Sequence, residues 1–203
     1  EIGQDVHVNG DLTAAINEGV RKGYQEGSLR KSIVSDPFER VNTNDNTPAA
    51  IYTEIVPGDQ LTVIVAPKGF GCENMSRLAM LKPSDGENGV RKFILETIRQ
   101  AGPNACPPLV VGVGIGGSFD KAAEISKKAL LRKIGTHHAV ERYARMEQEL
   151  FEEANQSGIG PQGFGGRTTV LAIHIETLPT HIAALPCAVN INCHSTRHER
   201  RVL

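Results

Sequence analysis

The apolar run from Leu109 to Ile115 constrains the fold of this chain more than any other feature. It holds no polar or charged side chain and is rich in valine, which predicts a buried strand. Gly116, Gly117 and Ser118 follow, and a helical pattern then covers residues 119–132. The centre of the chain is therefore expected to be a strand that turns sharply into a helix.

The rest of the chain alternates between helices, strands and polar loops. Asp11 can cap a helix over 12–25, whose apolar residues recur at helical spacing. Pro57-Gly58-Asp59 separates two apolar segments, 50–55 and 61–66, and predicts a β-hairpin. The other expected segments are an irregular polar loop over 29–48, a glycine-rich loop over 67–74, helices over 87–101 and 138–155, and strands over 168–175 and 188–192. This mixture predicts an α/β (α+β) fold with mixed β-sheets and flanking helices rather than a doubly wound sheet.

Composition narrows the possible functions. The net charge is −1 and basic residues are spread along the chain, so nucleic acid is not an expected partner. No apolar run is long enough to span a membrane and no signal peptide opens the chain, so a membrane partner is not expected either. Four cysteines are too few for a disulfide scaffold in 203 residues, which favours reduced thiols and a cytoplasmic location.

The chain is expected to form a single domain over residues 1–203. Its first residues, Glu1 to Val6, resemble the second half of a strand, and no Met begins the chain. We therefore expect a polypeptide whose N-terminal segment is missing.

Gly112, Gly114 and Gly117 match the dinucleotide-binding pattern G-x-G-x-x-G. That pattern is weak by itself, because a Rossmann unit also needs a second parallel strand after the helix. Here Gly135 and another helical segment follow, so we expect the βαβ unit to be incomplete. The glycines could instead let the strand pass close beneath a ligand and aim the next helix at negative charge. A tightly packed turn without a ligand also remains open.

Cys106 and Cys193 each lie at a junction between a strand and a loop. Cys106 precedes Pro107-Pro108 and the buried strand, and Cys193 follows the last strand. If both thiols bind one metal centre, closing the long loop between them costs roughly 4 kcal/mol. Metal–thiolate binding is worth ~10–16 kcal/mol in zinc peptides, which offsets that cost. The alternative is that the cysteines are small buried hydrophobic residues.

Two weaker cysteine hypotheses remain. Cys187, Cys193, His194 and His198 could bind zinc, although their spacing does not match a Cys-x2-4-Cys knuckle. A nucleophilic Cys–His pair has the same residues but no accompanying oxyanion motif. Cys72 could be a ligand or nucleophile, or only a small residue after a glycine loop.

Short motifs recur along nearly the whole chain: Gln4-Asp5-Val6-His7, Leu29-Arg30-Lys31-Ser32, Asn42 to Pro48, Lys68 to Met75, Cys106-Pro107-Pro108, Gly112 to Gly117, Gly158 to Gly163, Thr180-His181-Ile182-Ala183 and Asn192-Cys193-His194-Ser195. In this order they resemble the iron–sulfur hydro-lyases, the family of class I fumarase and L(+)-tartrate dehydratase alpha subunits. The resemblance implies a class I fumarase N-terminal (alpha-type) catalytic domain.

The resemblance also implies site residues and a cofactor. The family holds a [4Fe–4S] cluster on three cysteines, and Cys106 and Cys193 match two of these ligands. The third ligand lies in an upstream Cys-Gln-Asp-Thr-Gly segment that this sequence does not contain. Arg30 would clamp a substrate carboxylate, Gly71 would let the backbone approach the substrate, and His181 would be a catalytic proton-relay partner. Cys72 and Cys187 match no ligand position.

The implied reaction is the reversible dehydration of a 2-hydroxy dicarboxylate. Fumarate hydratase, which interconverts malate and fumarate in the tricarboxylic acid cycle, is the first expectation, and L(+)-tartrate dehydratase is the alternative. The implied partner is a beta subunit or C-terminal domain, in a homodimer or an α2β2 assembly, and the chain alone is expected to be inactive. A dinucleotide-binding oxidoreductase domain and a zinc-stabilised interaction module are the alternatives of other classes.

Overall fold

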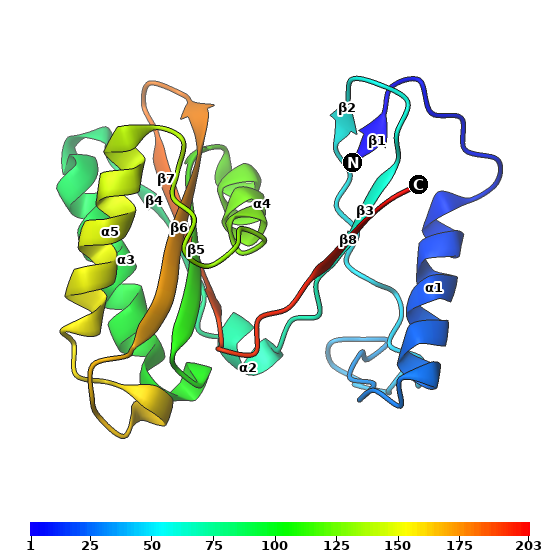
Figure 1. Cartoon of the computed structure of the whole chain (residues 1–203), viewed down its shortest axis with the longest axis horizontal. Coiled ribbons are helices and arrows are strands. Elements are labelled where there is room, and N and C mark those ends of the chain that lie inside the picture. The colour runs from blue at the N-terminus through cyan, green and yellow to red at the C-terminus, as the bar shows by residue number, and fades with distance from the viewer. The chain divides into compact units, whose positions relative to one another are not determined.

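The computed structural model describes residues 1–203, which form two compact units. Unit 1 comprises residues 1–64 and 200–203, and unit 2 comprises residues 65–199. The predicted fold class is confirmed, since both units combine β-sheet with helix (Figure 1). That residues 1–203 act as one catalytic domain stays a prediction. None of the helices is both long enough and apolar enough to cross a bilayer.

Unit 2 is built on a four-stranded mixed sheet with the strand order β4-β7-β5-β6. The strands are β4 (Arg77–Leu81), β5 (Leu109–Gly117), β6 (Val170–Thr180) and β7 (Leu185–Asn192). β5 is parallel to β6 and antiparallel to β7, and β7 is antiparallel to β4. The apolar run that predicted a buried strand is therefore a central strand, with a neighbour on each side.

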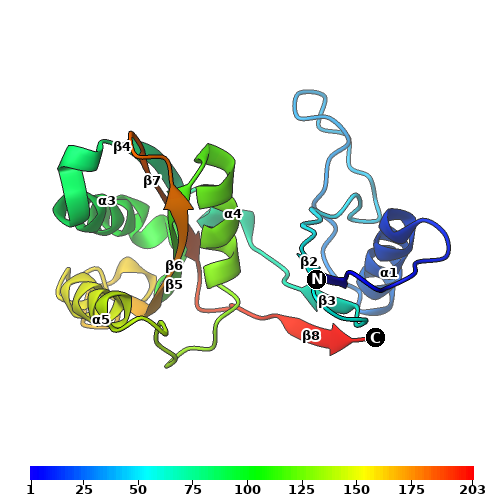
Figure 2. The same cartoon turned by 90° about the horizontal axis from the view of Figure 1, so that it is seen from above.

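Helices cover both faces of this sheet. The helices are α3 (Gly86–Ala101), α4 (Phe119–Ala129) and α5 (Glu141–Asn155). α3 and α5 lie on one face and α4 on the other (Figures 1 and 2). The main core lies on the α3 and α5 side, where Ile94 and Leu150 meet Val111 and Val113 of β5, all fully buried. The opposite face of β5 carries Val110 and the glycines, because successive strand residues point to opposite faces.

Two glycines of the predicted dinucleotide pattern let α4 contact the strand directly. A Cβ atom at Gly112 would lie 2.1 Å from the Ser126 carbonyl oxygen, and one at Gly114 would lie 2.1 Å from the Ala122 carbonyl oxygen. Both glycines lie inside β5 rather than in the turn before α4. They therefore serve close packing of helix on strand, one of the roles that the sequence left open.

The expectation of an incomplete βαβ unit is wrong. β5 and β6 are neighbouring parallel strands, and the chain between them contains both α4 and α5. The sequence predicted a second helix after α4, where a simple βαβ unit has its second strand. In the structure the connection from β5 to β6 contains both helices, α4 on one face of the sheet and α5 on the other.

Unit 1 contains α1 (Leu12–Glu26) and the short strands β1 (Ile2–Gly3), β2 (Ile55–Val56), β3 (Thr62–Val65) and β8 (Glu199–Val202). The predicted helix and its cap are confirmed, because the Asp11 side chain accepts a hydrogen bond from the Ala14 amide at 2.9 Å.

The predicted hairpin is wrong. β2 pairs with β1, and β3 pairs with β8. The first residues of the chain lie between the two expected arms: the Ile2 amide donates to the Glu54 carbonyl at 2.7 Å, and the Gly3 amide donates to the Gln60 carbonyl at 2.9 Å. The inner edges of both segments are therefore already occupied, so they cannot pair with each other.

Candidate functional site

The two predicted cluster cysteines lie at one edge of the unit 2 sheet. Because β5 and β7 are antiparallel, the start of β5 lies beside the end of β7, and Val110 is opposite Asn192. The start of β5 and the end of β7 lie at the lower end of the sheet in Figure 1. Cys106 comes just before β5, and Cys193 comes just after β7. The His194 Nδ1 atom lies 3.2 Å from the Cys106 carbonyl oxygen and joins the two segments directly. We call this end of the sheet the cysteine edge.

Cys106 is exposed and has a left-handed backbone, with φ 52° and ψ 61°. This conformation costs a non-glycine residue roughly 1 kcal/mol, so its surroundings must hold it. The Cys106 amide donates to the Pro103 carbonyl at 3.1 Å. Gln162 donates twice to the carbonyl of Pro107, from its amide at 2.8 Å and its Nε2 atom at 3.1 Å. The backbone of Cys106 is thus fixed while the residue stays accessible.

Cys193 is half-buried against the main core. Its amide donates to the Asn192 Oδ1 atom at 3.1 Å, and the Asn192 Nδ2 atom donates to the Thr196 hydroxyl at 2.9 Å. Asn192 itself is almost fully buried in β7. The Asn192 side chain therefore shapes the turn that presents Cys193.

The donor chemistry of the cysteine edge fits part of an iron–sulfur ligand set. Cys106 and Cys193 are free thiols in neighbouring segments, and thiolates are the usual ligands of such clusters. No group of three or more Cys, His, Asp or Glu side chains in this chain could hold a metal ion. The structure therefore brings together the segments of two of the ligands that the sequence predicts, and their binding to a cluster stays a prediction.

The other two cysteines are buried. Burial raises the pKa of the Cys187 thiol to about 12, which keeps it protonated in the core. The Cys72 thiol donates to the Gly69 carbonyl at 2.9 Å and lies 3.6 Å from Asn192 Oδ1. Cys187 is thus a poor zinc ligand, and Cys72 behaves as a small packed residue with a local hydrogen bond.

Gly71 also lies at the cysteine edge. It belongs to the short helix α2 (Phe70–Glu73), which contacts β7 and the 3-10 helix η2 (Gly102–Ala105) that ends at Cys106. Gly71 is exposed, and a Cβ atom there would meet nothing within 4 Å. Nothing within this chain therefore requires glycine at this position, and its contact with substrate stays a prediction.

A polar cluster beside the cysteine edge escaped sequence reasoning. The Lys68 Nζ atom lies 2.9 Å from Glu73 Oε2 and donates to the Ile191 carbonyl at 2.6 Å. Lys127 of α4 also pairs with Glu73, and Asn190 Nδ2 lies 3.4 Å from the same carboxylate. Burial opposes ionisation of Glu73, but hydrogen bonds from Lys127 and Lys68 outweigh it and hold the Glu73 pKa below its usual value. The only sequence signal was the polar Asn190 and Asn192 in an otherwise apolar strand.

His181 lies at the other end of the sheet. It is exposed in the turn between β6 and β7, where its Nδ1 atom accepts from the Ala183 amide at 3.2 Å. Since β6 runs parallel to β5, the end of β6 is far from the start of β5. Nine residues of β5 span roughly 30 Å at ~3.3 Å per residue. The structure does not bring His181 to the two cysteines.

Arg30 belongs to unit 1, just after α1. It is exposed and forms no ion pair in this structure. Its predicted role as a carboxylate clamp stays a prediction.

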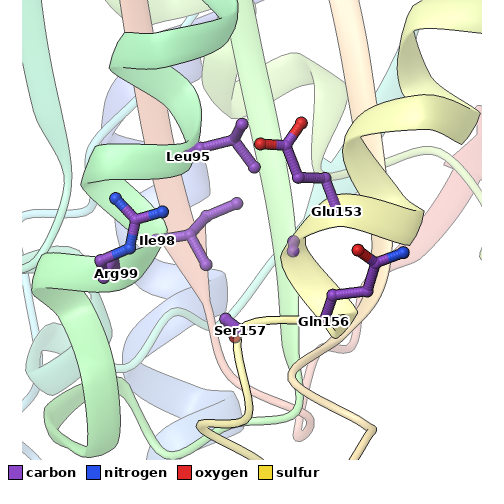
Figure 3. Close-up of a pocket in the computed structure, with 7 residues that line it drawn as sticks. Leu95, Ile98, Arg99, Glu153, Gln156 and Ser157 are labelled. Atoms are coloured by element: carbon purple, nitrogen blue, oxygen red, sulfur yellow. The ribbon is translucent and has the colours of Figure 1, made fainter.

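Unit 2 also contains two cavities without any predicted site residue. One, of about 160 Å³, lies between the C-terminal parts of α3 and α5, with Arg99, Glu153 and Gln156 around apolar Leu95 and Ile98 (Figure 3). The other, of about 290 Å³, includes Ala184 and Leu185, which follow the His181 turn.

Comparison with known proteins defines the family. The family model described as Fumarate hydratase (Fumerase) matches residues 1–202, so the chain belongs to this family, as its motifs predicted. The chain is 45% identical to the putative L(+)-tartrate dehydratase subunit alpha of Methanocaldococcus jannaschii over 187 residues, which are 90% of this chain and 65% of that protein.

Bacterial relatives give the same result. The chain is 37% identical to the L(+)-tartrate dehydratase subunit alpha of Escherichia coli strain UTI89 over 201 residues, which are 97% of this chain and 66% of that protein. The corresponding protein of strain K12 is 36% identical over the same length. The chain thus spans 65–66% of the length of these curated relatives.

Proposed function

We propose that this chain is part of the alpha subunit of an iron–sulfur hydro-lyase that removes water from a 2-hydroxy dicarboxylate, with L(+)-tartrate as the first substrate to test. The observation that carries this proposal is the convergence of Cys106 and Cys193 at one sheet edge in a member of the fumarase family. Fumarate hydratase was the first expectation from sequence. The names of the relatives favour tartrate instead, and malate becomes the alternative substrate.

Cys106 and Cys193 would hold a [4Fe–4S] cluster together with a third thiolate from outside this chain. When bound, such a cluster supplies a Lewis-acid iron for the substrate hydroxyl. The chain's own contribution is to hold both thiols still, through the left-handed backbone of Cys106 and the Asn192 side chain beside Cys193. Reduced cysteines suit the cytoplasm, the location we propose.

The substrate carboxylates need fixed cations and hydrogen-bond donors. Arg30 would bind one carboxylate through two parallel N–H bonds, a geometry that lysine cannot supply. The backbone around Gly71 would approach the substrate, where the absence of a side chain leaves room. A beta subunit would supply the remaining groups, since the relatives carry the name subunit alpha.

A role for His181 at the same substrate requires a second copy of the chain. Within unit 2 its turn is roughly 30 Å from the cysteine edge, too far for contact with one small dicarboxylate. In the proposed dimer or α2β2 assembly, a partner could bring its own His181 to that edge. Mixing Cys193→Ser subunits with His181→Ala subunits tests this, because a shared site would restore about one quarter of the activity. If no activity is recovered, His181 does not act at the site of a second copy of the chain.

The central test uses the full-length alpha subunit co-expressed with its beta subunit and purified without oxygen. We expect iron and sulfide to copurify, and L(+)-tartrate to be dehydrated faster than malate. Cys106→Ser and Cys193→Ser should each lose iron and activity, whereas Cys187→Ser should retain both in any fraction that folds. Iron-loaded protein that dehydrates neither substrate would overturn the proposal. Zinc without iron would favour the interaction module, and saturable NADH binding would favour the oxidoreductase.

A further inference from the structure

The end of β7, which presents Cys193, pairs with β5 on one side and is held by side chains rather than by a strand on the other. β4 begins at Arg77, opposite Val189, so no strand partner remains for Ile191 on that side. Instead, the Ile191 amide donates to the Ser76 hydroxyl at 3.0 Å, and the Ile191 carbonyl accepts from Lys68 Nζ at 2.6 Å. Both backbone groups of a fully buried residue are thereby satisfied.

Lys68 can occupy this position only because its charge is balanced. Its side chain is just 15% exposed, and an unpaired ammonium is costly to bury. Glu73 lies 2.9 Å away and is itself shared with Lys127 of α4 and Asn190 of β7. The lysine that reaches Ile191 is therefore aimed by a carboxylate anchored on two other elements. Because Glu73 already holds the Lys68 side chain, Lys68 loses little further conformational freedom when it bonds the Ile191 carbonyl.

The restraint continues from Ile191 to Cys193. Asn192 Oδ1 accepts the Cys193 amide at 3.1 Å and also faces the Cys72 thiol at 3.6 Å. Cys72 and Lys68 belong to the same short segment, which precedes β4. This segment thus contacts three successive residues of β7, Asn190, Ile191 and Asn192, and Asn192 in turn holds the Cys193 amide.

Cys106 is held chiefly by other groups: its amide donates to the Pro103 carbonyl, and Gln162 holds the next residue, Pro107. It meets the Cys193 turn only through His194, so it provides an internal comparison that should respond less.

We propose that Lys68, oriented by Glu73, is a positioning residue that fixes the Cys193 thiol for metal binding. Lys68 does not contact the thiol of Cys193 and acts through the Ile191 carbonyl and the turn that follows. The inference rests on the proposed function for the identity of the metal centre. The restraint on Cys193 is a property of the metal-free chain and can be measured without iron.

The first experiment compares metal-free chains with the natural sequence, Lys68→Met, Lys68→Arg and Lys121→Met. Lys121 is a matched control, because its exposed ammonium pairs with Glu124 and its side chain lies beside Gly117, at the end of β5 opposite to the cysteine edge. Hydrogen exchange and iodoacetamide labelling, both read by mass spectrometry, report on the Cys193 and Cys106 peptides separately. In Lys68→Met we expect roughly tenfold faster exchange at residues 191–193 and faster labelling of Cys193, with a much smaller change at Cys106. Lys68→Arg should restore much of the restraint.

The second experiment uses the anaerobic alpha–beta enzyme and measures iron loss to a chelator. Lys68→Met should lose iron roughly 10–100-fold faster, as supporting residues around metal ligands typically show. The paramagnetic resonance spectrum of its one-electron-reduced cluster should be broader than that of the natural sequence. Ser76→Ala, which removes the other bond to Ile191, should act in the same direction if Lys68→Met does not fold.

Two results would overturn the inference. One is unchanged exchange and labelling at Cys193 in Lys68→Met, and the other is an equal increase at Cys193, Cys106 and the rest of unit 2, which would mean general destabilisation. Failure of the proposed function looks different. In that case the natural sequence binds no iron, while the local effect on Cys193 in the metal-free chain persists.

Discussion

The two units of this chain are stabilised in different ways. Unit 2 has a continuous apolar core between its sheet and the helices α3 and α5. In unit 1 only Gly3 and Thr62 are fully buried, and α1 buries none of its residues completely. Because apolar burial drives folding at roughly 25 cal/mol per Å², unit 2 has the larger internal source of stability.

Unit 1 is held largely by hydrogen bonds from polar side chains to the backbone. Asn17 of α1 accepts the Ala49 amide at 2.8 Å, and Asn46 accepts the Ser32 amide at 2.8 Å. Asp45 accepts both the Thr47 amide and the Thr47 hydroxyl, and also pairs with Arg21. The long polar loop is therefore ordered locally, by its Asn and Asp residues. The comparison teaches that the same substitution should act very differently in the two units.

The largest expected effect comes from Glu147, the buried carboxylate of α5. It is 2% exposed and accepts from Arg132, from the His138 amide and from the Ile175 amide, which ties α5 and the crossover to β6. Removing one partner of a buried ion pair leaves an uncompensated charge, so Glu147→Ala should destabilise unit 2 by about 3–5 kcal/mol. Urea unfolding followed by peptide-resolved hydrogen exchange measures this.

The matched change in unit 1 is Arg21→Met, which removes an exposed pair with Glu18 and Asp45. It should alter exchange only near α1 and the Asp45 loop, and by much less. Comparable effects of the two variants would contradict the contrast between the units.

A second prediction applies one substitution to both units. Ala at Gly114 would place its Cβ atom 2.1 Å from the Ala122 carbonyl, so Gly114→Ala should push α4 away and cost about 1–3 kcal/mol. In α1, a Cβ atom at Gly19 meets nothing within 4 Å. Gly19→Ala should therefore stabilise unit 1 by about 0.5–1 kcal/mol, because it lowers the entropy of the unfolded chain.

The key result is that the same Gly→Ala change should lower the stability of unit 2 and raise that of unit 1. Urea unfolding followed by hydrogen exchange of peptides from each unit would give a separate unfolding midpoint for each unit. A stabilising Gly114→Ala would mean that α4 is not in direct contact with β5. A destabilising Gly19→Ala would mean that α1 is not helical at that position.

The same contrast explains how much the sequence could predict. In unit 2 the central strand and the helices α3, α4 and α5 were predicted, because burial on a sheet imposes a clear apolar pattern. The family resemblance, rather than any local pattern, predicted that Cys106 and Cys193 would lie together, and the antiparallel pairing of β5 and β7 places their segments side by side. The parallel crossover was missed, because a sequence does not show that two successive helices cover opposite faces.

Other features depended on contacts between distant segments. The hairpin failed because residues 1–5 insert between its arms, which no local turn pattern reveals. Lys68 and Glu73 were visible only as members of a motif, because their partners Ile191, Lys127 and Asn190 are far along the chain. Polar groups gain their roles from tertiary neighbours, whereas apolar periodicity is already present in the sequence.

The smallest expected effect is a difference between the two units in how their stability depends on pH. His174 in β6 is 1% exposed, and burial, with a smaller effect of the Arg132 charge, lowers its pKa below the usual value of about 6.5. The folded state therefore binds its proton less readily than the unfolded state. Its stabilising contribution is complete above pH 6.5 and is lost as pH falls below 6.5 towards the lowered pKa. Unit 2 should therefore lose stability from this group between pH 7 and pH 6.

Unit 1 should respond in another pH range, because its Asp45 carboxyl has a pKa held below the usual value by the Thr47 hydroxyl and amide and by Arg21. Stability from Asp45 is present above the ordinary aspartate pKa of about 3.9 and is lost only as pH falls below it. His174→Phe should thus reduce the pH dependence of the stability of unit 2 between pH 7 and pH 6 and leave the stability of unit 1 unchanged. Urea unfolding midpoints of each unit, followed by hydrogen exchange of its peptides, measure this. An unaltered slope in unit 2 would mean that His174 keeps an ordinary pKa in the folded protein, and that its burial is not what makes unit 2 sensitive to protons.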